Sequence, residues 1–393
     1  MSTPGGSSPV PPPAGPLAGV TVLELGGIGP GPFAGMMLAD LGARVIRLVR
    51  GPGWDRYPIL HRGRTAIDVD LKDPAGAAAV RTMAAGADVV IEGFRPGVAE
   101  RLGLGPEDLL AVNPGLVYGR MTGWGQEGPW ADTPGHDINY LGLTGALHAI
   151  GEKGRDPVPP LNLVADFGGG GMLLAYGIAC ALLSTRATGK GQVVDAAMVD
   201  GASSLMAMTY GFLSSGMWID ERGSNLLDGA APFYRTYRCA DEGHMAVGCI
   251  EPPFYRAFLE VLDLSDDELF SQQLDRSRWD EQAERIAAIF ATKPRADWED
   301  AFARTDACTT PVLSMTEAPH HPHVAARATF VEVDGVMQPV PAPRFSATPA
   351  PLPPRMSADR ASIERALADV GIGAEEAAGL IDAGLVAVPQ QQI

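Results

Sequence analysis

Two ionisable side chains interrupt apolar or glycine-rich sequence at points where they could move a proton. His136 lies in GHDINY (135–140), and Asp166 lies in LNLVADFGGGG (161–171), in front of a phenylalanine and four glycines. A histidine and a carboxylate that reach one cleft from separate loops are the minimum set for removing a proton and returning it. For Asp166 the alternative is a helix N-cap, whose side chain accepts the free amides of the first turn. The two roles are compatible, so the surrounding sequence must decide.

Basic residues gather at the ends of short apolar segments. In an open parallel sheet the strand ends share one edge, so these charges could converge on a polyphosphate. Any one of them could equally be a solvated surface charge. As a group they favour an anionic ligand: Arg47, Arg50, Arg62, Arg64, Lys72, Arg95 and Arg101.

Two other motifs carry weaker signals. The stretch GIGPGPFAG (27–35) formally matches a dinucleotide fingerprint, but Pro30 and Pro32 remove two amides that a pyrophosphate would use. It is interpreted as a tight turn that lets a bulky group approach the backbone. The stretch HHPH (320–323) lacks the spacing of a zinc site and predicts a solvated loop. We therefore expect neither a nicotinamide cofactor nor a metal.

The composition is that of a globular chain with no preference for polyanions. The 393 residues suit two domains, 46% of them are hydrophobic, and the net charge of −17 disfavours nucleic acid or an anionic membrane as partner. The uncharged run 167–183 is short for a membrane span and predicts a buried core helix. Four cysteines without a CxxC pair, and no export signal, favour a cytoplasmic location. Cys180 and Cys308 are expected in the core.

An alternation of strands and helices must position these residues. Strands are predicted at 20–25, 44–49, 65–71, 88–94 and 116–123, with helices at 32–42, 75–86 and 106–112 between them. This order is typical of a mostly parallel sheet with helices on both faces.

The alternation of strands and helices ends at about residue 225, and the different pattern that follows predicts a second domain. Residues 234–251 predict two strands around a turn, followed by helices near 253–261 and 279–291, so this domain is α+β. A proline-rich connector (339–355) and helices near 359–370 and 374–383 finish the chain. The predicted divisions are a disordered leader (1–16), a large α/β domain (17–215), a small α+β domain (225–330), and a connector with helices that return to the large domain (331–393).

Five longer blocks are more specific than any single motif. They are GIGPGPFAGMMLADLGARVIRL, IEGFRPGVAERLGLGPEDL, GHDINY, PLNLVADFGGGGM and GKGQVVDAAMVDG. Together they resemble the class III CoA-transferase superfamily, and within it the α-methylacyl-CoA racemase branch, over nearly all of residues 17–346. The resemblance implies a Rossmann-like large domain, a smaller α+β domain, an interlocked homodimer and a 2-methylacyl-CoA thioester substrate. It implies an isomerase that inverts the carbon beside the thioester and needs no metal or redox cofactor.

The resemblance also implies roles for individual residues. His136 and Asp166 match the two catalytic bases, and Glu251 matches a carboxylate that orients the histidine from the partner subunit. The positions that match CoA contacts are Arg50, Val69, Lys72, Arg101, Asp137 and Tyr140, with Arg50 and Arg101 expected on phosphates. An enolate needs one base per face and donors for its oxygen. The amides of Asp137 or of the glycine run are the expected donors, and the glycines are expected to leave room for the thioester beside Asp166, which would then be cap and base at once.

The acyl chain is expected on an adaptable apolar surface, because thioether side chains repack around varied shapes. The methionines considered are Met198, Met206, Met208 and Met217, although Met198 is favoured as an ordinary core residue. Two other functions remain open. In the transferase branch of the superfamily the residue that matches Asp166 is a nucleophile that forms an acyl anhydride. A non-catalytic CoA-binding protein is the third alternative, and the intact pair of bases argues against it.

Overall fold

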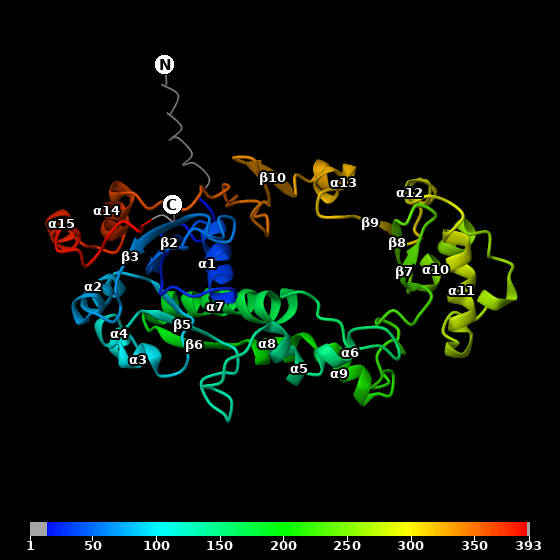
Figure 1. Ribbon diagram of the computed structural model, residues 1–393, viewed down its shortest axis with the longest axis horizontal. Helices are drawn as coiled ribbons and strands as arrows, with labels where there is room; N and C mark the ends of the chain where they lie inside the picture. The colour runs from blue at the N-terminus through cyan, green and yellow to red at the C-terminus, as the bar shows by residue number, and fades with distance from the viewer. Residues whose placement is uncertain (1–13, 391–393) are drawn as a thin grey trace, which may run out of the picture. The chain divides into compact units, whose positions relative to one another are not determined.

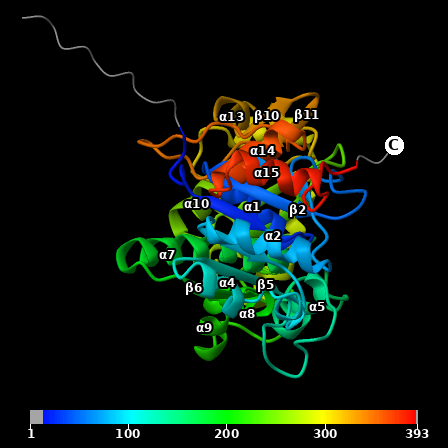
Figure 2. The ribbon, with the colours of Figure 1, turned by 90° about the vertical axis from the view of Figure 1, so that its left-hand side faces the viewer.

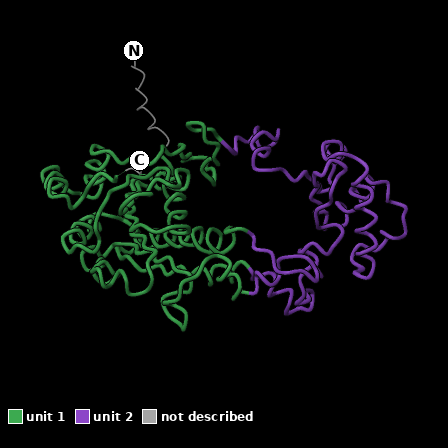
Figure 3. Tube along the Cα trace, in the orientation of Figure 1, with its two compact units in different colours: residues 1–144, 161–205, 331–393 green, residues 145–160, 206–330 purple. Residues whose placement is uncertain are grey.

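The computed structural model describes residues 14–390, which divide into two compact units. The first unit contains residues 1–144, 161–205 and 331–393, and the second contains 145–160 and 206–330 (Figure 3). The sequence placed 145–160 and 206–215 in the large domain. They belong instead to the second unit, because the chain leaves the first unit twice and helical periodicity alone does not show such an excursion. Most of the predicted leader, residues 1–13, lies outside the described residues.

The first unit is built on a six-stranded sheet in which every pair is parallel, in the order β3-β2-β1-β4-β5-β6 (Figure 1). This is the strand order of a Rossmann-type doubly wound fold, which confirms the predicted fold class. The chain reverses direction across the sheet between β1 and β4, where such folds bind ligands. The strands are β1 (Thr21–Glu24), β2 (Arg44–Val49), β3 (Arg64–Asp68), β4 (Val89–Glu92), β5 (Val117–Thr122) and β6 (Gln192–Ala197).

Helices cover both faces of this sheet, and Figure 2 looks onto one of these faces from outside. One face carries α2 (Pro74–Ala85), α4 (Pro106–Val112), α14 (Arg360–Asp369) and α15 (Ala374–Asp382), whose alanines and leucines form one apolar core with the strands. On the other face α1 (Pro30–Asp40) and α7 (Leu173–Thr188) contact each other, and α7 packs on β5 and β6. Residues 331–390, which include α14 and α15, thus belong to the first unit.

A row of charged side chains lies buried beneath α1. Strand residues alternate between faces, so Glu24, Arg47 and Arg64, on three adjacent strands, all point away from the α2 core. Glu24 is 0% exposed and pairs with both arginines, with a 2.8 Å bond from Arg64 Nε. Burial alone raises a carboxyl pKa, but Arg64 and Arg47 together hold the pKa of Glu24 below its ordinary value. The network ties three strands to α1, because Arg64 also donates to the Pro32 carbonyl.

The second unit is a small α+β domain. A three-stranded sheet of β7 (Tyr234–Arg238), β8 (His244–Gly248) and β9 (Thr309–Val312) is antiparallel in both pairings. It packs against α10 (Pro252–Val261), α11 (Trp279–Phe290) and α12 (Arg295–Phe302) around a core rich in aromatic rings. The two strands and two helices predicted for this region are present.

One segment, Leu163–Thr188, is long and apolar enough to cross a membrane by composition, and 44% of its most apolar window is buried in the structure. It consists of η1 (Leu163–Met172), wound as a π-helix, followed by α7. It contacts α1, α8 (Met198–Leu205) and the sheet of the first unit, but it is only partly buried, whereas the sequence predicted a buried core helix for 167–183.

Two local predictions were wrong. Cys180 and Cys308 are exposed, whereas Cys239 and Cys249 are buried. Cys180 falls on the outward side of α7, because that apolar helix is only partly covered within its own unit. The HHPH stretch is not a plain loop, since it spans the end of a short 3₁₀ turn and the start of α13 (Pro322–Ala326), with His321 Nε2 at 3.0 Å from Glu299 Oε1.

Candidate active site

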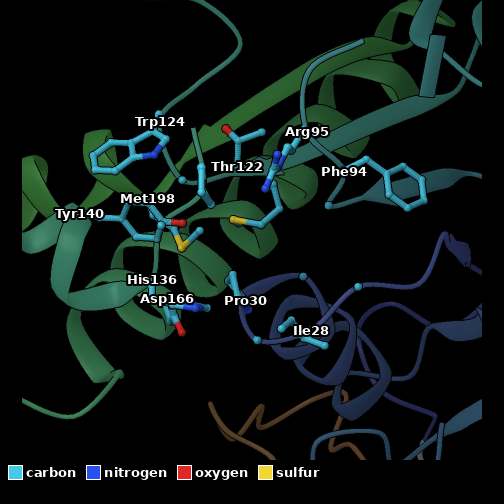
Figure 4. A pocket seen from close by; sticks show the side chains of 18 of the residues that line it. Ile28, Pro30, Phe94, Arg95, Thr122, Trp124, His136, Tyr140, Asp166 and Met198 are labelled. Atoms are coloured by element: carbon cyan, nitrogen blue, oxygen red, sulfur yellow. The ribbon is translucent and has the colours of Figure 1, made fainter. Parts of the chain in front are cut away.

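A cavity of about 420 Å³ opens at the carboxyl ends of β1, β4, β5 and β6. It therefore lies at the point where the strand order reverses, the usual ligand position in this fold class. His136, Tyr140 and Asp166 all line it (Figure 4). The predicted pair of proton-moving residues is thus brought to one cavity by two separate elements.

His136 stands at the N-cap position of α5 (Asp137–Leu143) and its side chain is exposed to the cavity. Its backbone N–H donates to Asn139 Oδ1 at 3.0 Å, which fixes the start of the helix. The imidazole is therefore carried by a defined helix end while its ring remains free to meet a ligand.

Asp166 is the fourth residue of η1, so it lies inside a helix. The predicted N-cap role is wrong. Its Oδ2 accepts a long hydrogen bond of 3.4 Å from Asn162 Nδ2, one turn earlier. Partial burial raises the pKa of the Asp166 carboxyl above its ordinary value; the Asn162 bond and His136 oppose the shift, and the neighbouring charge of Asp137 adds to it. A carboxyl of raised pKa can hold a proton as well as accept one.

The cap of this helix is Asp137. Its buried Oδ2 accepts the backbone N–H groups of Ala165 and Asp166, each at 2.8 Å. Asp137, which directly follows His136 in the chain, is therefore hydrogen-bonded to the backbone of Asp166, the second predicted base. The sequence predicted Asp137 as a CoA contact, but its carboxylate lines neither cavity of the site and is used inside the fold.

Replacing Asp137 with alanine is expected to destabilise the first unit by about 1–3 kcal/mol, because two backbone amides lose their acceptor. Asp137→Asn keeps one carbonyl oxygen for these amides and is expected to recover most of that loss. Urea unfolding and the rate of catalysis would both be measured. Equal stability of the alanine variant and the unaltered chain would show that the two hydrogen bonds carry no such weight.

The glycines after Asp166 serve packing between helices, which corrects the expectation that they make room for a substrate. Gly169, Gly170 and Gly171 are buried. A Cβ on Gly171 would lie 2.6 Å from the Pro30 carbonyl oxygen, and one on Gly169 would lie 2.6 Å from the Ala202 nitrogen. The glycines let η1 touch α1 and α8 at backbone distance. Their amides lie within the helix, so they are not free to donate to an oxyanion.

The turn before α1 forms the facing wall. Gly26, Gly27 and Gly29 adopt positive φ, and Pro30 opens the helix. A Cβ on Gly29 would lie 3.6 Å from Asp166 Oδ2, so this turn borders the carboxylate. The structure agrees with the predicted tight turn.

Two further residues line the cavity, Arg95 and Trp124; the sequence named Arg95 only among the basic residues at strand ends and did not single out Trp124. Arg95 reaches in from the end of β4, opposite His136 and Asp166 in Figure 4. Trp124, whose buried indole N–H has no partner among the described residues, packs edge-on against Tyr140 at 4.7 Å between centroids. Burial, and then the charge of Asp166, raise the pKa of Tyr140 to about 12. Asn162, four residues before Asp166, could have been found from helical spacing.

A second cavity of about 590 Å³ holds three of the residues predicted to contact CoA. Arg50, Val69 and Lys72 line it at the ends of β2 and β3. It shares Gly26, Gly27 and Phe94 with the first cavity, so the two adjoin. Arg101 lines neither, although Val98 and Leu102 of the same segment do line the second. Tyr140 belongs to the first cavity.

The remaining predicted residues are in the second unit, apart from Met198, which is buried and lines the first cavity. Glu251 is exposed at the start of α10. Met206, Met208 and Met217 also lie in the second unit, and the last two are more than half exposed, at 57% and 56%. Across residues 14–390, no three His, Cys, Asp or Glu side chains are grouped to hold a metal ion.

The fold agrees with comparisons to known proteins. A family model described as CoA-transferase family III matches residues 17–367. The chain therefore belongs to CoA-transferase family III.

Within that family the chain is similar to named enzymes. The alpha-methylacyl-CoA racemase of Mus musculus is 48% identical over 337 residues, covering 85% of this chain and 87% of the relative. The acetyl-CoA:oxalate CoA-transferase of Acetobacter aceti is 30% identical over 345 residues, covering 83% and 88%. A crystal structure of a CAIB/BAIF family protein from Brucella suis is similar with a TM-score of 0.75 and 27% identity, covering 95% of this chain and 100% of that one. The family resemblance predicted from the sequence is confirmed.

Proposed function

We propose that this chain interconverts the (2R) and (2S) epimers of 2-methylacyl-CoA thioesters. The observation that carries the proposal is the presence of His136 and Asp166 in one cavity, on elements that Asp137 joins. One base removes the α-proton to leave an enolate, and the conjugate acid of the other delivers a proton to the opposite face. One C–H bond breaks and one forms, so the enzyme ends each turnover with a single proton moved between its two bases.

The electrostatics of the two bases suit this exchange. The raised pKa of Asp166 brings its proton affinity closer to that of an imidazole, so each group can act as acid or base. The N–H of Asp137, the first residue of α5, is the candidate donor for the thioester oxygen, because first-turn amides have no partner within the helix. The Met198 thioether, which lines the same cavity as the two bases, supplies an adaptable apolar surface for the acyl chain.

The CoA handle is assigned to the second cavity. Arg50 and Lys72 supply positive charge there, and this cavity adjoins the one that holds the bases, since both are lined by Gly26, Gly27 and Phe94. The predicted phosphate ligands are Arg50 and Arg101, and an arginine can bind phosphate oxygens through two N–H groups at once.

Replacing Arg50 or Arg101 with alanine is expected to raise KM for the acyl-CoA by about tenfold while kcat changes less. Contacts with the phosphates are present in both the ground state and the transition state. Their loss therefore weakens binding of both states alike, which raises KM and leaves kcat nearly unchanged. Steady-state kinetics check this, with Arg56→Ala as the control, because Arg56 is exposed and lines neither cavity. If KM is unchanged in both variants, these arginines lie outside the CoA site.

The class of reaction is tested with one pure epimer of a 2-methylacyl-CoA and no carboxylic acid in the solution. The proposal expects both epimers to appear. Similarity to a CoA-transferase supports a second candidate, in which Asp166 attacks the thioester carbonyl and forms an acyl anhydride while CoA leaves. Rapid transfer of CoA to an added acid without epimerisation would establish that alternative. The higher identity to the racemase, 48% against 30%, favours epimerisation.

We further propose that the enzyme is a homodimer in which Glu251 of one subunit orients His136 of the other. Several large apolar side chains are exposed on the chain by itself, including Leu161 (75%), Tyr176 (65%) and Leu183 (73%). Apolar surface of this kind is typical of a face that a second copy covers.

Hybrid dimers test the arrangement. His136→Ala and Glu251→Ala chains should each be inactive alone, and refolding them together should restore some activity. A hybrid has one site with both residues intact and one site with neither. Hybrids that form properly yet stay inactive would place Glu251 in the same subunit or outside catalysis.

The reaction moves only a proton, so the proposal includes no metal or redox cofactor. We place the enzyme in the cytoplasm, with no nucleic acid or membrane as partner, on the charge and cysteine arguments made from the sequence.

A further inference from the structure

The chain after α15 ends in a tail, residues 384–390, that pairs with the end of the edge strand β3. The N–H of Asp68 donates to the Ala387 carbonyl at 2.9 Å, and the N–H of Ala387 donates to the Asp68 carbonyl at 3.0 Å. Val386 is 0% exposed and belongs to the same core as α14 and α15. Two backbone hydrogen bonds and a buried side chain therefore fix this tail beside the strand end that leads to Val69 and Lys72.

The tail also holds Trp54. The indole Nε1–H of Trp54 donates to the Gln390 carbonyl at 2.9 Å, while the ring lines the second cavity. The loop before it contains Gly51 and Gly53, both with positive φ. Glycine has the greatest conformational freedom of any residue, so the shape of this loop depends on how its ends are held. One end is β2, and the other is the tryptophan bound to the tail.

Arg50 starts that loop and stands between two hollows. Its side chain is 65% exposed, and its guanidinium bonds to Asp68 Oδ1 and Asp70 Oδ2, each at 3.1 Å. On one side is the second cavity. On the other is a hollow of about 310 Å³ whose lining includes Arg50, Asp68 and tail residues such as Ala387. The tail thus lines this hollow together with Asp68 and Asp70, the carboxylates that orient Arg50.

We propose that residues 385–390 are a positioning element for the nucleotide phosphates of CoA, acting through Trp54 and Asp68 on the Arg50 guanidinium. This inference rests on the proposed function. The match to the family model ends at residue 367, before this segment.

The physical basis is preorganisation. A free arginine loses side-chain entropy when it binds a phosphate, whereas one already held in place loses less. The guanidinium has five N–H donors, so it can bond to Asp68 and Asp70 and still present N–H groups to a phosphate. The cost is the nearby negative charge of the two aspartates: Asp68 lines only the hollow of about 310 Å³, whereas Asp70 lines both that hollow and the second cavity.

The test shortens the chain after Val388, which keeps Val386 and Ala387 but removes the Gln390 carbonyl. Loss of this one hydrogen bond is expected to weaken CoA binding about three- to tenfold by calorimetry. KM for an acyl-CoA should rise by a similar factor with little change in kcat. The pantetheine ester of the same acid lacks the nucleotide phosphates, so its kinetics should not change.

Two substitutions distinguish loss of the hydrogen bond between Trp54 and Gln390 from a general disordering of the tail. Trp54→Phe keeps an aromatic ring but has no N–H, and should weaken CoA binding as much as the truncation. Combining the two should cause no additional loss, because both remove the same bond. Gln390→Ala keeps the backbone carbonyl and is the control that should bind CoA like the full chain.

Two results overturn the inference alone: a full chain that binds CoA while the shortened chain binds it equally well, or an equal loss with the CoA and pantetheine esters. A full chain that binds no CoA refutes the proposed function and this inference together.

Discussion

Replacing either His136 or Asp166 with alanine is expected to lower the rate of epimerisation by about 10²–10⁴-fold, the usual contribution of a general acid or base. Each turnover needs one group to take the proton and the other to return one, so loss of either stops inversion. The two residues line the same cavity and carry separate proton sites. The measurement is kcat/KM for both directions with pure epimers.

Isosteric variants separate chemistry from folding. Asp166→Asn keeps the shape of the side chain and the helix around it, but an amide is no base, so it should lose as much activity as the alanine variant. The raised pKa of Asp166 further predicts that proton removal by this residue declines on acidification at a pH above the ordinary aspartate range, since only the carboxylate accepts a proton. Full epimerisation by Asp166→Asn would exclude Asp166 as a base.

Replacing Glu24 with alanine is expected to destabilise the first unit by about 3–5 kcal/mol, because two buried arginines would be left without their carboxylate. Glu24 is 0% exposed, and its partners Arg47 and Arg64 are 6% and 0% exposed at the side chain. Denaturant unfolding gives the difference in free energy. The control is Asp369→Ala, which breaks an exposed pair with Arg44 and should cost at most about 1 kcal/mol.

The same network predicts a dependence on pH. The pKa of Glu24 is lower in the folded chain than its ordinary value of 4.5, so its contribution is present above that value and is lost as the pH falls through the folded pKa. The Glu24→Ala variant should therefore lose less stability on acidification than the unaltered chain. Identical loss in the two proteins would contradict the assigned charge state.

Elements with strong local signals could be predicted from the sequence. The strand 44–49 and the helix 106–112 occur with the bounds expected, because a charged or proline start and an apolar period mark their ends. The carboxyl ends of parallel strands meet at one edge, so the position of Arg50 and Lys72 beside a cavity also followed from topology.

Features that depend on long-range contacts could not be predicted. The π-helix around Asp166 has no hydrophobic period of its own, and its cap, Asp137, is remote in sequence. The glycine run indicated a close approach, but the sequence does not say whether the approaching group is a ligand or another helix. The bridge between Ala387 and Asp68 is also a long-range contact that could not be predicted, since neither residue type favours β-pairing.

The central claim is that two bases act on opposite faces of one carbon, and deuterium uptake from heavy water by each pure epimer tests it most directly. The family resemblance assigns His136 to the 2S epimer and Asp166 to the 2R epimer. The His136→Ala variant should therefore still exchange the α-proton of the 2R epimer, and the Asp166→Ala variant that of the 2S epimer, with both variants remaining folded. Equal loss of exchange from both epimers in each variant would contradict the division of labour.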